Sequence, residues 1–467
     1  MADVVLVNPI IPSWYTEVLE VHPEKDWLKP PVGSPPLGLL YIAAYLVSRG
    51  YKVKVLDIMR KKIKKSEFIG FLEQEQPKIV GLVVFSEATV SVFEFCSSAK
   101  EWNPNVITVL GGPHVTFMDE ETLQHEAVDI IVRGEGELSM AELADYFLQQ
   151  RGSLNEIKGI TYKMNTGKDV EIVRNPGRPY IKELDQLPFP LRTAIDMEEY
   201  PMPGTIITSR GCPGSCIFCA AGAISGGRYR TRGIDNVILE IEEMRRIFKI
   251  DYITVVDDTF TAFPERTRAF CHYYNKSNSG FAWGCESRVD DVSRELLTLM
   301  VESGCDAIQF GVESGVQSVL YSIRKNITVE QIEVAVRWAR EAGIRFIACS
   351  FIIGHHSDTH DTVRQTLEFA KHLRDSYGVT PFFGMCTPYP GTYLYRNREK
   401  LGVTIYSKGW DTHQLIYSNI STKYLTRQDI QRWYYKASEL FRDDIKKIEN
   451  IRLRRSKHKS QSPNIIV

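Results

Sequence analysis

The chain has 467 residues, of which 43% are hydrophobic and 25% charged, and its formal net charge is −1. This composition is typical of a globular protein with roughly two to four domains. The balanced charge excludes a global basic field, so no nucleic-acid partner is expected. The start of the sequence has no charged, cleavable leader, and its apolar helical stretch at 38–47 is too short to span a bilayer. A cytoplasmic location is therefore expected.

Residues 1–150 alternate β-branched runs with helical patterns, which predicts an α/β fold with a Rossmann-like, doubly wound parallel sheet. In such a sheet, ligands bind outside the carboxyl ends of the strands. Small and polar residues follow the predicted strands at 8–9, 85–89, 111–116 and 133–137. Turn chemistry explains each of these segments separately. It explains less well why they recur after every strand, so a ligand site at this edge is predicted.

The pattern changes at 151–203, which we interpret as a linker containing a β-hairpin around Asn165–Gly167. Strand and helix alternation resumes at 204–395, and its six strand-like units predict a partial (β/α)6 barrel of the TIM type. Residues 396–467 predict a small, mostly helical C-terminal region with an amphipathic helix at 426–450. Its basic tail is interpreted as a solvated end that makes at most peripheral membrane contact.

Three cysteines, Cys212, Cys216 and Cys219, lie close together on a loop that contains glycine and proline. Thiolates at this spacing can converge on a soft metal centre. Structural zinc takes four ligands, usually as two pairs, and the sequence has no second pair. The other six cysteines are scattered singly, which argues against a disulfide framework. A cubane iron–sulfur cluster held by three cysteines leaves one iron open for another ligand.

The Cys-x3-Cys-x2-Cys loop, with Phe218 before the third cysteine, resembles the cluster loop of radical S-adenosylmethionine (SAM) enzymes. The resemblance implies a [4Fe-4S] cluster whose open iron binds SAM. It also implies an external electron donor, a flavodoxin or ferredoxin, and cleavage of SAM to methionine and a 5′-deoxyadenosyl radical. Further barrel segments resemble SAM-binding motifs of the same family. They imply contacts to the SAM amino group, carboxylate, ribose and adenine by Asp257, Asp258, Thr259, Arg288, Glu313, Ser314 and Gly354.

For each of these barrel residues, a satisfied structural contact remains the alternative interpretation. One segment departs from the family pattern, because "GHHSDT" stands at 354–359 where relatives commonly have Gly-x-Pro-Gly-Glu-Thr. His355 and His356 therefore belong either to a substrate-specific loop or to an exposed, inert replacement, and we favour the second.

The segments at 35–46, 110–116 and 128–137 resemble the cobalamin-binding domain that precedes the barrel in one radical SAM subgroup. The Asp-x-His-x-x-Gly motif, which supplies a cobalt-binding histidine in other cobalamin domains, is absent from the sequence. We expect His114 to be a loop residue near the nucleotide tail. The resemblance implies that the corrinoid contacts Pro36, Ser86, Glu87, Gly111, Gly112, His114, Gly134 and Glu135.

The resemblance implies a cobalamin-dependent methyltransferase that acts on an unactivated carbon, or a phosphinate phosphorus, of a small molecule or lipid. The alternative keeps both cofactors but performs ring formation, rearrangement or oxidative cyclisation. Methylthiolation is disfavoured because relatives that insert sulfur carry a second cysteine cluster in their N-terminal domain, and residues 1–211 contain only Cys96. A corrinoid or metal carrier without chemistry is also disfavoured, because it would need no open iron. The sequence indicates no catalytic acid or base. Among C-terminal aromatics, Tyr389 and Tyr393 are better pocket candidates than Trp410, Tyr417, Tyr424 and Trp433, which we interpret as core.

Overall fold

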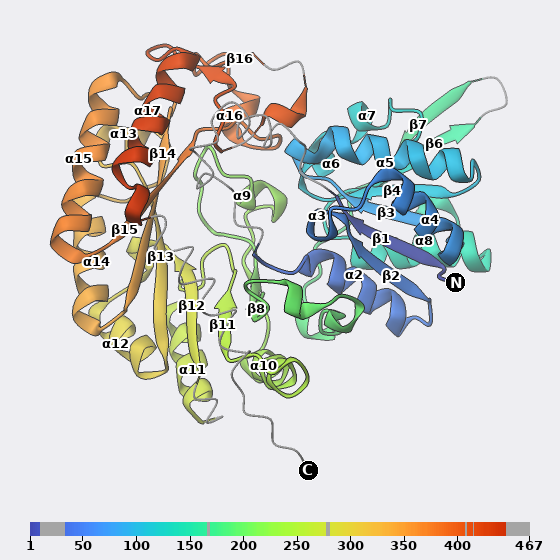
Figure 1. Ribbon diagram of the computed structural model, residues 1–467, viewed down its shortest axis with the longest axis horizontal. Coiled ribbons are helices and arrows are strands. Elements are labelled where there is room, and N and C mark those ends of the chain that lie inside the picture. Colours follow the sequence, from blue (N-terminus) through green and yellow to red (C-terminus); the bar gives the residue numbers. More distant parts are fainter. Residues whose placement is uncertain (10–32, 166–168, 277–280, 407–408, 414, 445–467) are drawn as a thin grey trace.

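The structure, a computed structural model, describes residues 1–9, 33–165, 169–276, 281–406, 409–413 and 415–444. Two α/β units lie side by side, the first in blue to cyan and the second in green to red (Figure 1). Within the described ranges, no helix is both long enough and apolar enough to cross a membrane.

The first unit is built on a seven-stranded sheet in the order β2-β1-β3-β4-β5-β6-β7. The first five strands are parallel, as predicted. Their bounds are β1 (Val4–Asn8), β2 (Val53–Asp57), β3 (Ile79–Val83), β4 (Ile107–Gly111) and β5 (Ile130–Val132). Every residue of β1 is buried, because helices cover both faces of the sheet.

The hairpin predicted inside a linker is part of this sheet, which corrects the interpretation of that segment. Strand β6 (Ile160–Asn165) pairs antiparallel with β5, and β7 (Val170–Arg174) pairs with β6. Ile160 and Tyr162 are buried in the core of the first unit. Burying these side chains against the sheet edge lowers the free energy more than leaving them exposed in a separate linker hairpin. Residues 166–168 of the predicted turn lie outside the described ranges.

Helices pack on both faces of the first sheet. Helices α4 (Lys65–Glu75) and α5 (Thr89–Trp102) form one apolar core with it. Helices α2 (Leu37–Ser48) and α8 (Glu137–Gln149) form the other. The carboxyl ends of β3, β4 and β5 point toward the second unit and continue into short segments. β3 leads into the 3-10 helix η2 (Ser86–Ala88), β4 into the helices α6 (Pro113–Phe117) and α7 (Asp119–Thr122), and β5 into the turn before α8.

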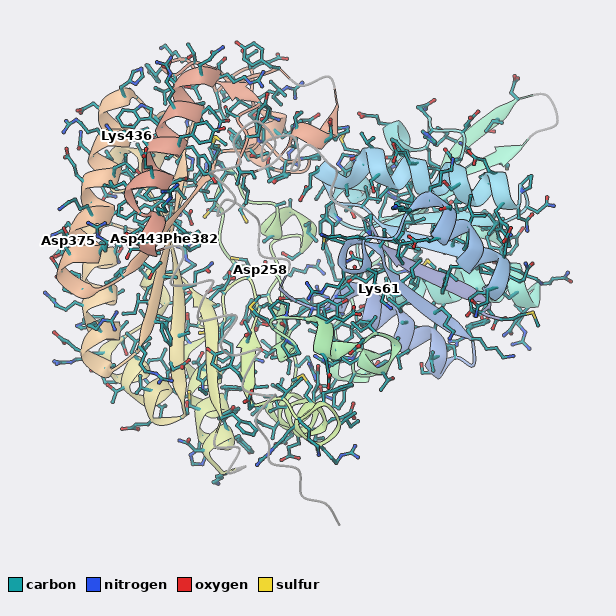
Figure 2. The ribbon with its side chains drawn as sticks, viewed as in Figure 1. Lys61, Asp258, Asp375, Phe382, Lys436 and Asp443 are labelled. Carbon is teal, nitrogen blue, oxygen red and sulfur yellow. The ribbon has the colours of Figure 1, made fainter. Side chains whose placement is uncertain are left out.

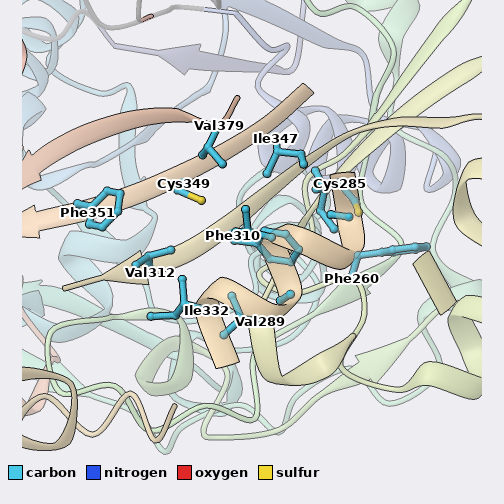
Figure 3. Packing of buried hydrophobic residues seen from close by; sticks show 14 of the residues in the cluster. Phe260, Cys285, Val289, Phe310, Val312, Ile332, Ile347, Cys349, Phe351 and Val379 are labelled. Atoms are coloured by element: carbon cyan, nitrogen blue, oxygen red, sulfur yellow. The ribbon is translucent and has the colours of Figure 1, made fainter. Parts of the chain in front are cut away.

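The second unit is an open, partial barrel of six parallel strands in the order β15-β14-β13-β12-β11-β8, as predicted. The strands are β8 (Thr205–Ile206), β11 (Tyr252–Val255), β12 (Ala282–Ser287), β13 (Cys305–Glu313), β14 (Phe346–Ile353) and β15 (Thr380–Met385). The outer helices are α10 (Ile234–Phe248), α11 (Pro264–Lys276), α12 (Arg294–Glu302), α14 (Val329–Ala342) and α15 (His360–Tyr377). Phe310, Phe351 and Cys349 pack in the core between strands and helices (Figure 3).

The C-terminal region closes one side of the barrel. Helix α17 (Arg427–Leu440) begins after a capping box formed by Thr426 and Asp429, close to its predicted start, and packs beside β15. A two-stranded antiparallel sheet of β16 (Thr404–Ile405) and β17 (Ile420–Ser421) was not predicted. The predicted basic tail lies outside the described residues.

Gly204 occupies a site with no room for a side chain, just before β8. A Cβ built there lies 1.9 Å from the Tyr252 carbonyl oxygen and 2.7 Å from Ile250 Cγ2. We expect Gly204→Ala to lower the free energy of unfolding by about 1–3 kcal/mol, because β8 must shift away from β11. Urea denaturation of the full chain measures the change.

Gly70→Ala is the matched control, since a Cβ at this exposed position in α4 meets nothing within 4 Å. It should stabilise the protein by about 0.5–1 kcal/mol, because alanine is the better helix former. Equal effects of the two substitutions would contradict the packing argument.

Candidate functional site

A cavity of about 450 Å³ lies between the two units, at the carboxyl ends of the parallel strands of the first sheet. It extends from Gly111 and Gly134 in the first unit to Gly211 and Asp258 in the second. Figure 2 labels Asp258 between the two halves of the molecule. Both units therefore build one cavity, where strand-end sites of α/β folds are found.

The glycine-rich wall of this cavity contains four of the residues predicted to bind a corrinoid, namely Gly111, Gly112, Gly134 and Glu135. Gly112 has a φ of +109°, and a Cβ there would lie 2.9 Å from the Val84 carbonyl oxygen. At Gly134 a Cβ would meet nothing within 4 Å, so the missing side chain leaves open space for a ligand. This cradle fits a large, flat cofactor.

A smaller cavity of about 250 Å³ adjoins the first and contains three more predicted residues, Ser86, Glu87 and His114. Tyr389, predicted as a pocket residue, also lines it. Burial raises the pKa of Glu87, and burial together with the Glu87 charge raises the pKa of Tyr389. Pro36 lines neither cavity and directly precedes α2.

His114 was expected in a loop, but it lies in the short helix α6 and is buried. Its Nδ1 is 3.0 Å from the Ser86 hydroxyl, and its ring packs edge-on against Trp410 at 4.9 Å. Burial lowers the pKa of His114 to about 4, so its ring is neutral near neutral pH. Helix α6 starts at Pro113 because proline favours the first helical turn.

The three cysteines lie on the loop between the short paired strands β9 (Ser209–Arg210) and β10 (Arg230–Thr231). The Cys212 sulfur accepts a hydrogen bond from the Gly214 amide at 3.3 Å, and the Arg288 guanidinium is 3.9 Å from the Cys216 sulfur. Burial raises the pKa of the Cys212 and Cys216 thiols, so a bound metal is needed to hold them as thiolates near neutral pH.

Across the part of the chain that the structure describes, no three His, Cys, Asp or Glu side chains converge closely enough to bind a single metal ion. A cubane cluster does not require such convergence, because each cysteine binds a different iron atom. Cys219 is exposed, and Cys212 and Cys216 are half-buried, so the loop can accept a cluster from its open side.

The two aspartates after β11 have different surroundings. The Asp257 carboxylate is buried and accepts hydrogen bonds from the Thr208 amide at 2.6 Å and the Ser209 hydroxyl at 2.6 Å. Asp258 lines the main cavity, and burial raises the pKa of its carboxyl. Thr259 is also buried and donates to Asp291 at 3.0 Å. Asp257 and Thr259 therefore support the chain, and Asp258 is the one available to a ligand.

Two cations lie beside the cluster loop, and only Arg288 was predicted. Arg288 bonds to Asp290 and to the Lys325 carbonyl oxygen, each at 2.8 Å. The buried Lys325 ammonium is 2.9 Å from Glu313, which was predicted to contact ribose. Both cations act on Cys216 to lower its pKa, although burial has the larger effect. Lys325 lies in the mostly polar segment 323–328 after α13 (Gln317–Ser322), so the sequence offers no local signal for this residue.

The turn after β14 contains Gly354 and two histidines. The Gly354 and His355 amides donate to the Asp358 carboxylate at 3.0 and 2.9 Å. His355 is buried, so the expectation of an exposed replacement is wrong for this residue, and its ring lies 5.4 Å from Phe218. Its Nε2 has no hydrogen-bond partner among the described atoms. An unpaired buried nitrogen beside the cluster loop fits a site that receives a polar ligand.

Ser314 and most of the C-terminal aromatics make contacts within the protein. Ser314 is buried, with its hydroxyl 3.1 Å from Thr366. Trp410 packs on His114, Tyr393 and Tyr417 lie beneath Arg324 and Arg427, and Trp433 donates to His360. Tyr424 is exposed. Tyr389 is thus the one of this predicted set that lines either of the two cavities.

Comparisons with known proteins agree with this geometry. The chain matches the family model of the radical SAM superfamily at residues 206–370 and that of the B12 binding domain at residues 29–144. It is 34% identical to an uncharacterized methyltransferase of Pyrococcus horikoshii, over 90% of this chain and 91% of the relative.

Two further proteins show the range of the similarity. An anaerobic magnesium-protoporphyrin IX monomethyl ester cyclase of Rubrivivax gelatinosus is 31% identical over 78% of this chain and 66% of its own. The cobalamin-dependent S-adenosylmethionine radical enzyme OxsB, with aqua-cobalamin bound, has a similar fold. It superposes with a TM-score of 0.73 at 19% identity, covering 95% of this chain and 67% of that one.

Proposed function

Because the chain belongs to the cobalamin-binding radical SAM enzymes, we propose that it transfers a methyl group to an unactivated carbon, or a phosphinate phosphorus, of a small molecule or lipid. The observation that carries the proposal is the shared cavity. It joins the glycine cradle of the first unit to Gly211 and Asp258, beside the cluster loop of the second. A corrinoid in the glycine cradle and a cluster on the loop would therefore open onto the same space, where they would supply a methyl group and a radical.

The candidate site residues divide into three groups by the cofactor that they fit, and Asp258 and the corrinoid group line the cavity itself. Cys212, Cys216 and Cys219 hold the [4Fe-4S] cluster. Arg288 and Lys325 offer positive charge to the SAM carboxylate, because both lie near Cys216. The remaining SAM contacts fall to Asp258, Glu313, His355 and the Gly354 backbone. The corrinoid is held by Gly111, Gly112, Gly134 and Glu135.

When bound, these cofactors supply a carbon-centred radical from SAM and a transferable methyl group on cobalamin. The chain's own contribution is to position both and to keep the intervening space largely apolar, since Leu39, Ile42 and Val256 also line the cavity. The buried, neutral His114 lies beside the smaller cavity and is a hydrogen-bonding group, not a charged one. An electron donor of the flavodoxin or ferredoxin class and a cytoplasmic location belong to the same proposal.

The test does not require the substrate. The protein is purified without oxygen, reconstituted with iron, sulfide and hydroxocobalamin, reduced with titanium(III) citrate and given SAM. We expect S-adenosylhomocysteine and methylated cobalamin in amounts stoichiometric with the bound cobalamin. 5′-Deoxyadenosine should form as well. Formation of 5′-deoxyadenosine without any S-adenosylhomocysteine would instead favour ring formation or rearrangement, as the name of the Rubrivivax relative suggests for that protein.

A further inference from the structure

The neck of the cluster loop is held by a carboxylate from the other unit. Arg210 and Arg230 face each other across the antiparallel β9 and β10 pair, so they mark the two ends of the loop. Glu135, from the segment between β5 and α8, lies 2.8 Å from Arg210 and 2.9 Å from Arg230. One side chain of the first unit therefore joins both ends of the cluster loop.

A second glutamate reinforces this contact. Glu137, the first residue of α8, lies 2.6 Å from the second terminal nitrogen of Arg210. The backbone of Ile181 completes the arrangement, because its amide donates to Glu135 at 2.8 Å and its carbonyl accepts from Arg230 at 2.6 Å. We call Glu135, Glu137, Arg210 and Arg230 the carboxylate clamp.

The four side chains of the clamp are largely shielded from water, so their relative positions are tightly constrained. The exposed fractions of its four side chains are 14%, 5%, 18% and 11%, in the order named above. In such a site, charge-assisted bonds from two guanidinium groups to one carboxylate fix both distance and orientation. If Glu135 moves, Arg230 loses its carboxylate and Arg210 keeps only Glu137. A shift on one side of the clamp is therefore transmitted to the cluster loop.

All four clamp residues also line the 450 Å³ cavity. Glu135 immediately follows Gly134, whose missing side chain leaves open space there. Gly211, at the start of the cluster loop, lines the same cavity directly after Arg210. A corrinoid in the cavity and a cluster on the loop would thus stabilise the same arrangement of the same four side chains.

We propose that the carboxylate clamp couples the two cofactor sites, so that an assembled cluster tightens corrinoid binding and a bound corrinoid orders the cluster loop. This inference rests on the proposed function only in requiring both cofactors, and it does not depend on methyl transfer. Coupling between binding sites is reciprocal, so one factor describes both directions. Glu135 contacts the corrinoid side directly, but toward the cluster it is a positioning residue, since it acts there through Arg210 and Arg230.

The test measures the dissociation constant of hydroxocobalamin for the full chain with and without the cluster. Wild-type protein reconstituted with iron and sulfide is compared with Cys212→Ala, which lacks a cluster ligand. We expect the cluster-loaded protein to bind hydroxocobalamin about five times more tightly or better. In the Glu135→Gln background the same comparison should give a ratio near one. Within the clamp, Glu137 pairs with Arg210 and not with Arg230, so Glu137→Gln should give an intermediate ratio.

Asp306→Asn is the matched control, because this carboxylate also pairs with an arginine, Arg345, at 2.6 Å. It lies at the start of β13, outside the residues that line the cavity. The ratio in this variant should equal that of the wild type. An unchanged ratio in both clamp variants, or no coupling in the wild type, would overturn the proposal.

A spectroscopic measurement separates coupling from general loss of stability. In the wild type, hydroxocobalamin should change the EPR spectrum of the reduced cluster, and this change should disappear in Glu135→Gln. A change that persists in this variant counts against the clamp. Failure to form S-adenosylhomocysteine would count against methyl transfer and leave this result standing, so the two proposals fail separately.

Discussion

Replacing Cys216 by alanine should remove the iron–sulfur cluster and lower SAM cleavage by a factor on the order of 10³ or more, because the cluster initiates the reaction. The Cys216 sulfur lies beside Arg288, deep in the cluster loop, and its side chain is half-buried. Two cysteines alone leave two irons without a protein ligand, which makes a cubane labile. Iron and sulfide content per chain, the EPR spectrum and the rate of 5′-deoxyadenosine formation measure the loss.

Cys349→Ala is the matched control. This cysteine lies in β14 of the same barrel and is fully buried in the apolar core. Its replacement should lower stability by about 1 kcal/mol, because a small cavity replaces the sulfur. It should leave the cluster and SAM cleavage intact. A cluster that survives Cys216→Ala with its usual EPR spectrum would contradict the assignment of the three cysteines.

Replacing Glu240 by alanine should lower the free energy of unfolding by about 3–5 kcal/mol, the largest stability effect that we expect from a single substitution. Glu240 lies in α10 and is fully buried between two arginines. Its two carboxylate oxygens are 2.6 Å from Arg192 and 2.5 Å from Arg232. Without the carboxylate, two buried guanidinium groups lose their counter-charge.

This ion triad also joins separate parts of the chain. Arg192 belongs to the segment between the units, and Arg232 additionally donates to the Tyr41 hydroxyl of α2 at 3.2 Å and to the Ile207 carbonyl at 2.9 Å. We therefore expect the whole protein to unfold at lower urea concentration, with both units affected. Circular dichroism and tryptophan fluorescence of the full chain follow the transition.

Glu368→Gln serves as the surface control. Glu368 pairs with Arg364 at 2.7 Å, one turn away on the exposed face of α15. Such exposed pairs contribute about 0.3–0.5 kcal/mol, since water and salt screen them. Similar losses of unfolding free energy for Glu240→Ala and Glu368→Gln would contradict this argument. They would show that the buried triad contributes no more to stability than an exposed pair.

Much of the fold could be predicted because its signals are local. Strands β1, β3 and β14 are apolar runs, and the helices between them carry apolar faces, so periodicity indicates both their type and order. The β6 and β7 hairpin shows the limit of that reasoning. Its turn was recognisable, but its pairing with β5 depends on a sheet edge formed by residues far away in the sequence.

The site divides in the same way. Cys212, Cys216 and Cys219 stood out in the sequence because metal ligands on one loop require a short, definite spacing. The different roles of Asp257 and Asp258 could not be predicted from the sequence. The two adjacent side chains point in different directions, and of the two only Asp258 lines the cavity. Lys325 was missed because it lies after α13, and only the fold brings its ammonium to Glu313 at the end of β13.

The sequence alone determined the three-cysteine loop and two α/β units in fixed order, and its family resemblance implied the class of chemistry. These properties depend on residue type and short spacing, which are written directly in the chain. Only the tertiary structure decided how the two units meet. The shared cavity, the Arg192–Glu240–Arg232 triad and the carboxylate clamp arise from contacts between segments remote in sequence. Their geometry depends on burial and packing, which no local pattern encodes.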